Sequence, residues 1–287
     1  VGVKECISCA SGTDALLISL KSLNLKKNDE VIVPEATWIA TLSAVIFLGA
    51  KPVFADIEKD TWCISPEDIR KKITENTKAI IPVHNYGHPA DMEEIAKIAK
   101  EHNLYVVEDA APGIGSKING KITGNFGHVA AFSFQGAKPL VTGEGGMIVT
   151  DDDEIFEKCY YYWDHCREPG EILFNTSIGY KYKLSNIQAA LGLAQLERIE
   201  EIINKRREIF FWYNSRIDSN QNFTVNIERE GYYNSFYVPT IVLSEKYSEQ
   251  DRDEICQKLT ENGVLNRPFW RPISKMVPHF EPAITPV

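Results

Sequence analysis

Four groups of residues have types and spacings that could do chemistry, and the first two follow predicted strands. The turn Ser-Gly-Thr at residues 11–13 offers hydroxyls and free amides at the start of a predicted helix, which suits a phosphate group. The alternative is a plain N-cap, because Ser and Thr cap many helices that bind nothing. Glu108 and Asp109 follow the apolar run 104–107, and ligands of open parallel sheets bind outside the carboxyl ends of strands. These acids therefore face the predicted site, unless they belong to a solvated loop.

The third group is Lys138, which stands between the apolar run 132–134 and a glycine-rich turn at 143–146. Glycines there let the backbone come close to a bound group. A partly desolvated lysine favours the neutral amine and Schiff-base chemistry, whereas an ordinary surface lysine before a hairpin is the alternative. The fourth group, residues 180–183, is a basic and aromatic patch that could receive a phosphate or form a solvated edge.

The order of these groups is more specific than any one of them. A phosphate-binding turn is followed by an aromatic residue after a strand (Trp38), an acid at a strand end and a lysine in a glycine-rich loop. A carboxylate such as Asp109 could hold a pyridine nitrogen protonated, so the order suggests pyridoxal phosphate. Motifs for phosphate loops, zinc proteases and nucleophile elbows are missing, and no metal site is predicted.

The elements that must position these groups alternate in the first half of the chain. Between residue 4 and about 150, short apolar runs and helical patterns take turns, which is typical of a parallel sheet with crossover helices. Strands are expected at 4–10, 30–34, 52–56, 78–83, 104–108, 129–134 and 146–150. Helices are expected at 12–23, 66–73 with Ser65 as cap, 91–102 and 152–163.

The second half predicts a long helix and a smaller domain. The pattern from 184 to about 217 indicates one amphipathic helix that bridges two domains, with an apolar stripe of Leu193, Leu196, Ile199 and Ile203. We expect a large domain over 1–216, truncated at its N-terminus, and a small, incomplete one over 217–287. The second would hold strands at 223–227 and 237–243, a helix at 249–261 and a proline-rich tail.

Composition narrows the classes of protein. The 287 residues carry a net charge of −9, which argues against a dedicated nucleic-acid binder. The most apolar stretch, 38–50, is shorter than the about 20 residues of a spanning helix, so no membrane anchor is expected. Six scattered cysteines fit a reducing, cytoplasmic compartment rather than a disulfide framework. Cys6 and Cys9 share a predicted strand and are interpreted as a buried structural pair.

These residues resemble the DegT/DnrJ/StrS family of sugar aminotransferases over nearly the whole chain. The resemblance implies the aspartate aminotransferase fold: an α/β domain of fold type I with a mostly parallel sheet flanked by helices, and a small C-terminal α/β domain. It rests on Ser11-Gly12-Thr13-Asp-Ala-Leu, Thr37-Trp38-Ile-Ala-Thr41, Pro82-Val-His84-Asn-Tyr86-Gly87-His-Pro-Ala-Asp91-Met, Glu108-Asp109-Ala-Ala111, Phe132-Ser133-Phe134 with Lys138, Gly143-Glu144-Gly145-Gly146 and Ser185-Asn186-Ile-Gln188-Ala-Ala-Leu-Gly.

The resemblance implies a role for each group. Lys138 would bind the cofactor covalently and move protons to and from the carbon that is aminated. Asp109 would pair with the pyridine nitrogen and keep the ring an electron sink, and Trp38 would stack on the ring. The other cofactor contacts would be Ser11, Gly12, Thr13, Ala111, Ser133 and Lys181.

Substrates and partners follow from the same resemblance. L-glutamate would give its amino group to a keto carbon of a nucleotide-linked 6-deoxy sugar. C4 is the favoured carbon, because the motif spacing looks closest to members that make 4-amino-4,6-dideoxy sugars. His165, Lys183 and Arg267 would contact this substrate. In a homodimer with shared sites, residues 180–183 of one protomer would reach the cofactor phosphate of the other.

Departures from the family pattern leave alternatives open. Relatives usually carry Gln, His or Glu where this chain has Pro112, which has no N–H or side-chain donor for the cofactor hydroxyl. Lys181 and Lys183 stand where relatives commonly have Asn and Arg. The alternatives are amination of a 3-keto sugar, a 3-dehydratase, or a regulator that keeps the fold without turnover. Dehydratase members replace the lysine with histidine, so Lys138 favours the aminotransferase.

Overall fold

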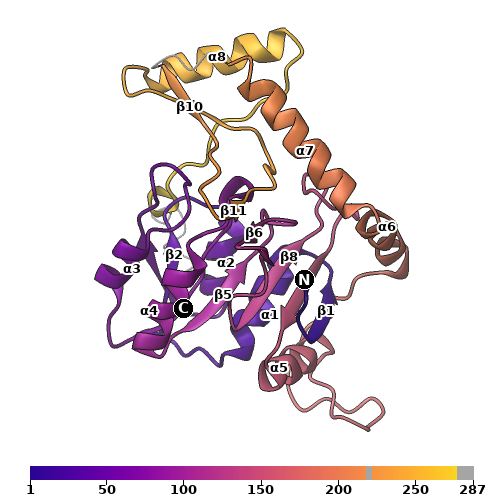
Figure 1. Cartoon of the computed structure of the whole chain (residues 1–287). Helices are drawn as coiled ribbons and strands as arrows, with labels where there is room; N and C mark the ends of the chain where they lie inside the picture. The colour runs from indigo at the N-terminus through magenta and orange to yellow at the C-terminus, as the bar shows by residue number, and fades with distance from the viewer. Residues whose placement is uncertain (218–221, 277–287) are drawn as a thin grey trace.

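A seven-stranded sheet forms the centre of the part of the chain that the computed structural model describes, residues 1–217 and 222–276 (Figure 1). Its order is β1-β9-β8-β5-β4-β2-β3. The strands are β1 (Glu5–Cys9), β2 (Glu30–Pro34), β3 (Lys51–Ala55), β4 (Thr77–Ile80), β5 (Tyr105–Asp109), β8 (Val129–Ser133) and β9 (Gly146–Thr150). The predicted α/β fold with a mostly parallel sheet is confirmed.

The direction of the strands brings the predicted site residues to one edge. Strand β9 is antiparallel to both β1 and β8, so these two run the same way, and the pairs from β8 to β3 are all parallel. The carboxyl ends of β1, β2, β5 and β8 therefore lie along the same edge. Residues 11–13, Asp109 and Ser133 all follow or end these strands.

Five helices pack on this sheet, and capping residues start three of them. Their bounds are α1 (Gly12–Ser22), α2 (Ile39–Phe47), α3 (Pro66–Lys72), α4 (Met92–His102) and α5 (Asp153–Trp163). Ser11, Asp91 and Asp152 each accept a backbone N–H of the first turn. Ser65 occupies the N-cap position of α3 as predicted, but its side chain makes no capping hydrogen bond. Helix α2 lies in the stretch 38–50, which was noted only for its apolar residues.

The expected long helix is two helices. The chain breaks at Arg198, whose φ of −114° and ψ of 16° lie outside the helical range, between α6 (Asn186–Leu196) and α7 (Ile199–Asn214). The break separates the predicted stripe. Leu193 and Leu196 are 60% and 55% exposed, whereas Ile203 is buried. Ile203 packs where Gly115 lacks a side chain, because a Cβ there would lie 2.6 Å from the isoleucine.

The chain after residue 222 partly returns to the first half of the chain, where it joins a second, three-stranded sheet. Helix α7 leads away from the sheet towards α8 (Glu249–Glu261), which lies beside β10 (Phe223–Val225), the partner of β12 (Ile241–Leu243) (Figure 1). The predicted strand 237–243 is thus shorter. Strand β11 (Tyr232–Tyr233) instead pairs with β6 (Lys117–Ile118), which pairs with β7 (Lys121–Ile122). The division at residue 216 stays a prediction, and the tail beyond residue 276 lies outside the described residues.

The cysteine pair was interpreted wrongly. Cys9 is buried and Cys6 is exposed. Residues three apart on a strand point to opposite faces, so the two thiols cannot share one environment. In the described ranges, no group of three His, Cys, Asp or Glu side chains is placed to hold a metal ion. No helix of those ranges is long and apolar enough to cross a membrane.

Glu108 and His84 form a fully buried pair behind the site edge. His84 Nδ1 accepts the N–H of Ala90 at 3.0 Å, so Nε2 carries the proton that it donates to Glu108 Oε1 at 2.7 Å. The Glu108 carboxylate also accepts three backbone N–H groups of the loop 124–127. Burial raises the pKa of Glu108, but these hydrogen bonds outweigh it and the net shift is downward.

Removal of this carboxylate is expected to destabilise the protein by about 3–5 kcal/mol, because the donors around it would be left buried and unpaired. Urea unfolding of Glu108→Ala and Glu108→Gln would measure this, with the exposed Glu67→Gln as control. A lowered folded pKa means that the contribution is complete above the unfolded value of about 4.3 and is lost as pH falls through the folded pKa. The gap between wild type and Glu108→Gln should therefore shrink on acidification. A gap that stays constant would contradict the assignment.

Candidate active site

Asp109 is a buried acid at the carboxyl end of β5. Thr41 Oγ1 donates to its Oδ2 at 2.9 Å, and the N–H of Ala111 donates to its Oδ1 at 3.2 Å. Thr37 lies behind Thr41, with 3.1 Å between the two hydroxyl oxygens. Burial raises the pKa of Asp109, while the Thr41 hydrogen bond and the charge of Lys138 oppose that rise. A carboxylate in this position is stabilised by a cation that faces it.

Lys138 supplies one such group. It follows β8 in a turn in which its N–H donates to Gln135 O at 2.8 Å. Burial lowers the pKa of the Lys138 amine, and the nearby Asp109 carboxylate works in the opposite direction. Its Nζ lies 4.7 Å from the centre of the Tyr237 ring. The structure therefore brings together a lysine biased toward its neutral form and a buried acid, an arrangement suited to proton transfer.

The phosphate-binding turn lies beside the end of β8. Ser11 is the N-cap of α1, and its hydroxyl accepts the N–H of Asp14 at 3.1 Å, which is the plainer of the two predicted roles. The first amides of the helix lack intrahelical acceptors and remain available to an anion. A Cβ on Gly12 would lie 2.6 Å from the Cβ of Ser133, so glycine is required for this close approach.

Gly12→Ala is accordingly expected to destabilise the protein by about 1–3 kcal/mol, as overpacking does elsewhere. The backbone of β8 cannot move away from a new Cβ at residue 12 without disturbing the sheet. Urea unfolding compared with Gly136→Ala provides the matched control, since a Cβ at Gly136 would meet only one atom, at 3.9 Å. Equal stabilities of the two variants would show that helix α1 does not approach β8 as described.

Trp38 lies one helical turn before Thr41. It precedes α2, accepts the Thr41 N–H on its backbone oxygen at 3.2 Å, and leaves 62% of its surface exposed. The loop that carries it is held by Asn85, whose Nδ2 donates to Ala36 O at 2.8 Å and Trp62 O at 2.6 Å. The Trp38 side chain is thus anchored through its backbone and open to a planar ligand.

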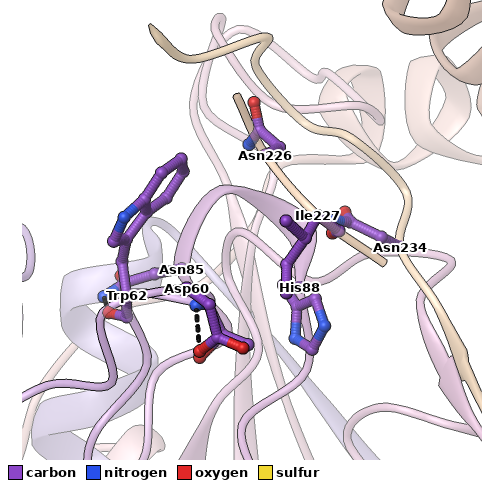
Figure 2. Close-up of a pocket in the computed structure, with 8 residues that line it drawn as sticks. Asp60, Trp62, Asn85, His88, Asn226, Ile227 and Asn234 are labelled. Carbon is purple, nitrogen blue, oxygen red and sulfur yellow. Dashed lines mark hydrogen bonds between the residues drawn. The ribbon is translucent and has the colours of Figure 1, made fainter. Parts of the chain in front are cut away.

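A small pocket lies next to the loop that carries Trp38, since Asn85 belongs to its lining. Figure 2 shows side chains from the loops after β3 and β4 facing residues on both sides of β11. Arg229 donates two hydrogen bonds, at 2.6 and 2.9 Å, to the carboxylate of the lining residue Asp60. The lining residues are Asp60, Thr61, Trp62, Asn85, His88, Asn226, Ile227 and Asn234, none of which was predicted for the site.

Pro112 occupies a tight turn next to Asp109. The N–H of Gly113 donates to Ala110 O at 2.9 Å, and a Cβ on Gly113 would lie 2.8 Å from the His84 side chain. Ala111 is half-buried and contributes its N–H to Asp109 rather than a side-chain contact. The turn therefore fixes the orientation of the Asp109 carboxylate, while Pro112 adds no donor.

The basic segment 180–183 runs beside the end of β1. The N–H of Ala10 donates to Tyr182 O at 2.8 Å, and Lys181 is exposed beside it. Lys183 is paired with Asp164, and its Nζ lies 4.2 Å from the centre of the Trp163 ring. In the described part of the chain, no hydrogen bond or ion pair joins this segment to Lys138.

The remaining predicted substrate residues lie on separate segments. His165 is half-buried, with a left-handed φ of 60°, and donates its backbone N–H to Tyr180 O at 3.1 Å. Arg267 is exposed, and its charge acts on Tyr237, the tyrosine below Lys138. Sequence reasoning did not assign roles to Thr41 and Tyr237. Thr41 had a usable signal, because it follows Thr37 by one helical turn in a quoted motif, whereas Tyr237 had none.

Pyridoxal phosphate fits the chemistry of this edge. The free amides at residues 12 and 13 could hold its phosphate, Asp109 offers a buried carboxylate to its ring nitrogen, and Lys138 offers an amine to its aldehyde. Trp38 offers an exposed indole face for stacking. These residues could hold the cofactor without rearrangement of the sheet.

The sheet order and this edge define the fold of an aminotransferase. The sequence model of the DegT/DnrJ/EryC1/StrS aminotransferase family matches residues 1–284. The chain belongs to this family, as the motifs predicted.

Individual relatives agree with that assignment. The chain is 39% identical to a GDP-perosamine synthase of Escherichia coli O157:H7 over 96% of this chain and 74% of the relative. It is 36% identical to a UDP-N-acetyl-3-dehydro-alpha-D-glucosamine 3-aminotransferase of Acidithiobacillus ferrooxidans, over 94% and 71%. A putative sugar aminotransferase of Streptococcus pneumoniae, solved in its PLP form, superimposes with a TM-score of 0.90 at 26% identity, over 97% of this chain and 76% of that one.

Proposed function

We propose that this chain is a pyridoxal phosphate-dependent aminotransferase that moves an amino group from L-glutamate to C4 of a nucleotide-linked 4-keto-6-deoxy sugar. The observation that carries the proposal is the proximity of Lys138 to the buried Asp109 at the site edge of a family fold, where the charge of each side chain shifts the pKa of the other. Similarity to the GDP-perosamine synthase supports a GDP-linked sugar as the first acceptor to test. When bound, the cofactor supplies an electron sink for the carbon that gains or loses the amino group.

The protein's own residues supply the binding and the proton transfers. Lys138, whose pKa is lowered by burial, would move a proton away from the α-carbon of L-glutamate in the first half-reaction and toward the sugar carbon that gains the amino group in the second. Asp109, oriented by Thr41 and the Ala111 N–H, holds positive charge at the ring nitrogen. The amides at residues 12 and 13 bind the phosphate.

Substrate contacts are assigned to exposed or half-buried groups on separate segments. We propose that His165, Lys183 and Arg267 contact the sugar nucleotide. Lys183 would exchange its pairing with Asp164 for a phosphate, which its flexible stem allows. Arg267 is near enough to Tyr237 for its charge to oppose the rise that burial causes in the pKa of that hydroxyl, which supports a place near the reacting sugar.

A homodimer is part of the proposal, because large apolar side chains are left uncovered beside residues 180–183. Helix α6 has no buried residue, and the hairpin before residue 180 exposes a second apolar group. Single exposed hydrophobes are ordinary, but two groups of them on either side of one segment of the sequence favour an interface. The set is Ile187, Leu191, Leu193 and Leu196 on α6 and Ile172, Leu173, Phe174 and Ile178 on the hairpin. Residues 180–183, Lys181 included, would then reach the partner's phosphate site.

Release of 2-oxoglutarate from L-glutamate tests the proposal. With pyridoxal phosphate and a GDP-linked 4-keto-6-deoxy sugar, we expect stoichiometric release together with a 4-amino sugar identified by mass spectrometry and NMR. Release only with a 3-keto sugar nucleotide would replace C4 by C3 as the proposed position, as in the name of the Acidithiobacillus ferrooxidans relative. No release with any keto sugar would favour the regulator alternative, to which Pro112 points.

A further inference from the structure

An arginine that the proposed mechanism does not use is tied to the backbone of the catalytic lysine. Arg206 lies in the middle of α7, and its Nη2 donates to Lys138 O at 3.2 Å. Its Nη1 donates to Tyr237 O at 2.9 Å. One guanidinium therefore joins three segments that are far apart in the sequence: the lysine turn, α7 and the strand-free run after β11 (Tyr232–Tyr233).

The electrostatic setting of Arg206 is unusual for a half-buried cation. Within residues 1–217 and 222–276, no carboxylate lies within ion-pair distance of it, whereas its neighbour Arg207 is paired with Glu228. Burial lowers the pKa of Arg206. Two carbonyl oxygens in place of a carboxylate compensate a guanidinium incompletely. Such a cost is tolerated where the rigid fork geometry of arginine is itself useful.

The two hydrogen bonds of the Arg206 guanidinium, called the fork below, have a direct consequence for the Lys138 side chain. It fixes the backbone of Lys138 against the backbone of Tyr237, and the lysine Nζ then lies 4.7 Å from the centre of the Tyr237 ring. The face of an aromatic ring attracts an ammonium ion and stabilises it. Two charged groups also act here: the Asp109 carboxylate raises the pKa of the Lys138 amine, and the Arg267 charge opposes the rise that burial causes in the pKa of Tyr237.

We infer that Arg206 is a positioning residue that holds Lys138 over the ring face of Tyr237 whenever the lysine amine is free. The inference rests on the proposed function for its biological meaning, but the geometry on which it depends belongs to the protein alone. Without the fork, the lysine turn can separate from Tyr237 and its amine can reach water. Loss of burial would return the amine toward ordinary lysine behaviour, while loss of the ring alone would remove only the attraction for the ammonium ion.

The test measures the protonation of Lys138 in cofactor-free protein. Brief acetylation with acetic anhydride over about pH 6 to 10, followed by peptide mass spectrometry, gives the midpoint of amine reactivity at Lys138. Arg206→Met is expected to move this midpoint to higher pH, because the amine becomes solvated. Arg206→Lys keeps a cationic donor for one of the two carbonyl oxygens, so its midpoint is expected to lie between those of wild type and Arg206→Met. Arg207→Met, the adjacent arginine in the same helix, is the matched control and should leave the midpoint in place.

Changes at Tyr237 are expected to act in the opposite direction. Tyr237→Leu keeps an apolar cover but removes the ring face, so the midpoint moves to lower pH and acetylation near pH 7 rises about two- to fivefold. Tyr237→Phe keeps the ring and should match wild type. A midpoint in Arg206→Met equal to that of wild type, or an equal shift in Arg207→Met, would overturn the inference.

The two proposals can fail separately. Binding of pyridoxal phosphate by the wild type is measured on the same preparations. Midpoints that shift as expected in a protein that binds no cofactor would leave the positioning role in place and remove the proposed function. Normal cofactor binding with unmoved midpoints would remove the positioning role of Arg206 and leave the proposed function in place.

Discussion

Lys138→Ala is expected to lower the turnover number of glutamate-dependent amination by about a thousandfold or more. Among the described residues, Lys138 is the lysine whose charge lowers the pKa of Asp109, and a positioned acid–base group contributes up to about 10⁴-fold in rate. The fold should survive, because Lys138 is half-buried at the site edge and no ion pair ties it to the core. Release of 2-oxoglutarate under saturating substrates measures the effect.

The exposed Lys27→Ala serves as the control for loss of a lysine. Burial lowers the pKa of Lys138, so the rising limb of turnover against pH should lie below the ordinary lysine value of about 10.4. A Lys138→Ala variant that keeps more than about a tenth of wild-type turnover would contradict the assigned role.

Asp109→Asn is expected to lower turnover by about a hundredfold, the size of the loss when one preorganised charge-stabilising group is removed from a site. The amide has nearly the shape of the acid, so Thr41 and the Ala111 N–H can still orient it, but it carries no charge for the ring nitrogen. The Asp109 charge also raises the pKa of the Lys138 amine, so its loss should shift lysine reactivity to lower pH.

Variants of Thr41 separate orientation from charge. Thr41→Val removes the hydroxyl that donates to Asp109 and is expected to cost about tenfold in turnover, the value of one hydrogen bond to a charged group. Thr41→Ser keeps the hydroxyl and should remain near wild type. If Asp109→Asn and Thr41→Val lowered turnover equally, orientation rather than charge would be the function of Asp109.

The strands of a mostly parallel sheet could be predicted because each strand has a local signal. The runs at 30–34 and 146–150 match β2 and β9 in full, and the helix at 249–261 matches α8. The placement of Asp109 and residues 11–13 at one edge follows from strand direction alone. The family motifs then assign each residue a role.

The parts that were missed depend on contacts between distant segments. Periodicity continued through Arg198, so nothing local showed that α6 and α7 are separate or that Leu193 would face outward. Strand β11 exists only because β6 offers an edge, and the two-residue strands have no pattern of their own. The contacts of Arg206 with Lys138 and Tyr237 are likewise invisible without the fold.

Covalent trapping of the cofactor tests the central claim most directly. Protein incubated with pyridoxal phosphate is reduced with borohydride, digested and mapped by mass spectrometry, with Lys138→Ala treated in parallel. We expect one stoichiometric phosphopyridoxyl group on the peptide that contains Lys138, its prevention by prior incubation with L-glutamate, and no specific label in the variant. Label spread over exposed lysines at equal levels in both proteins, or stoichiometric label at another lysine, would contradict the account.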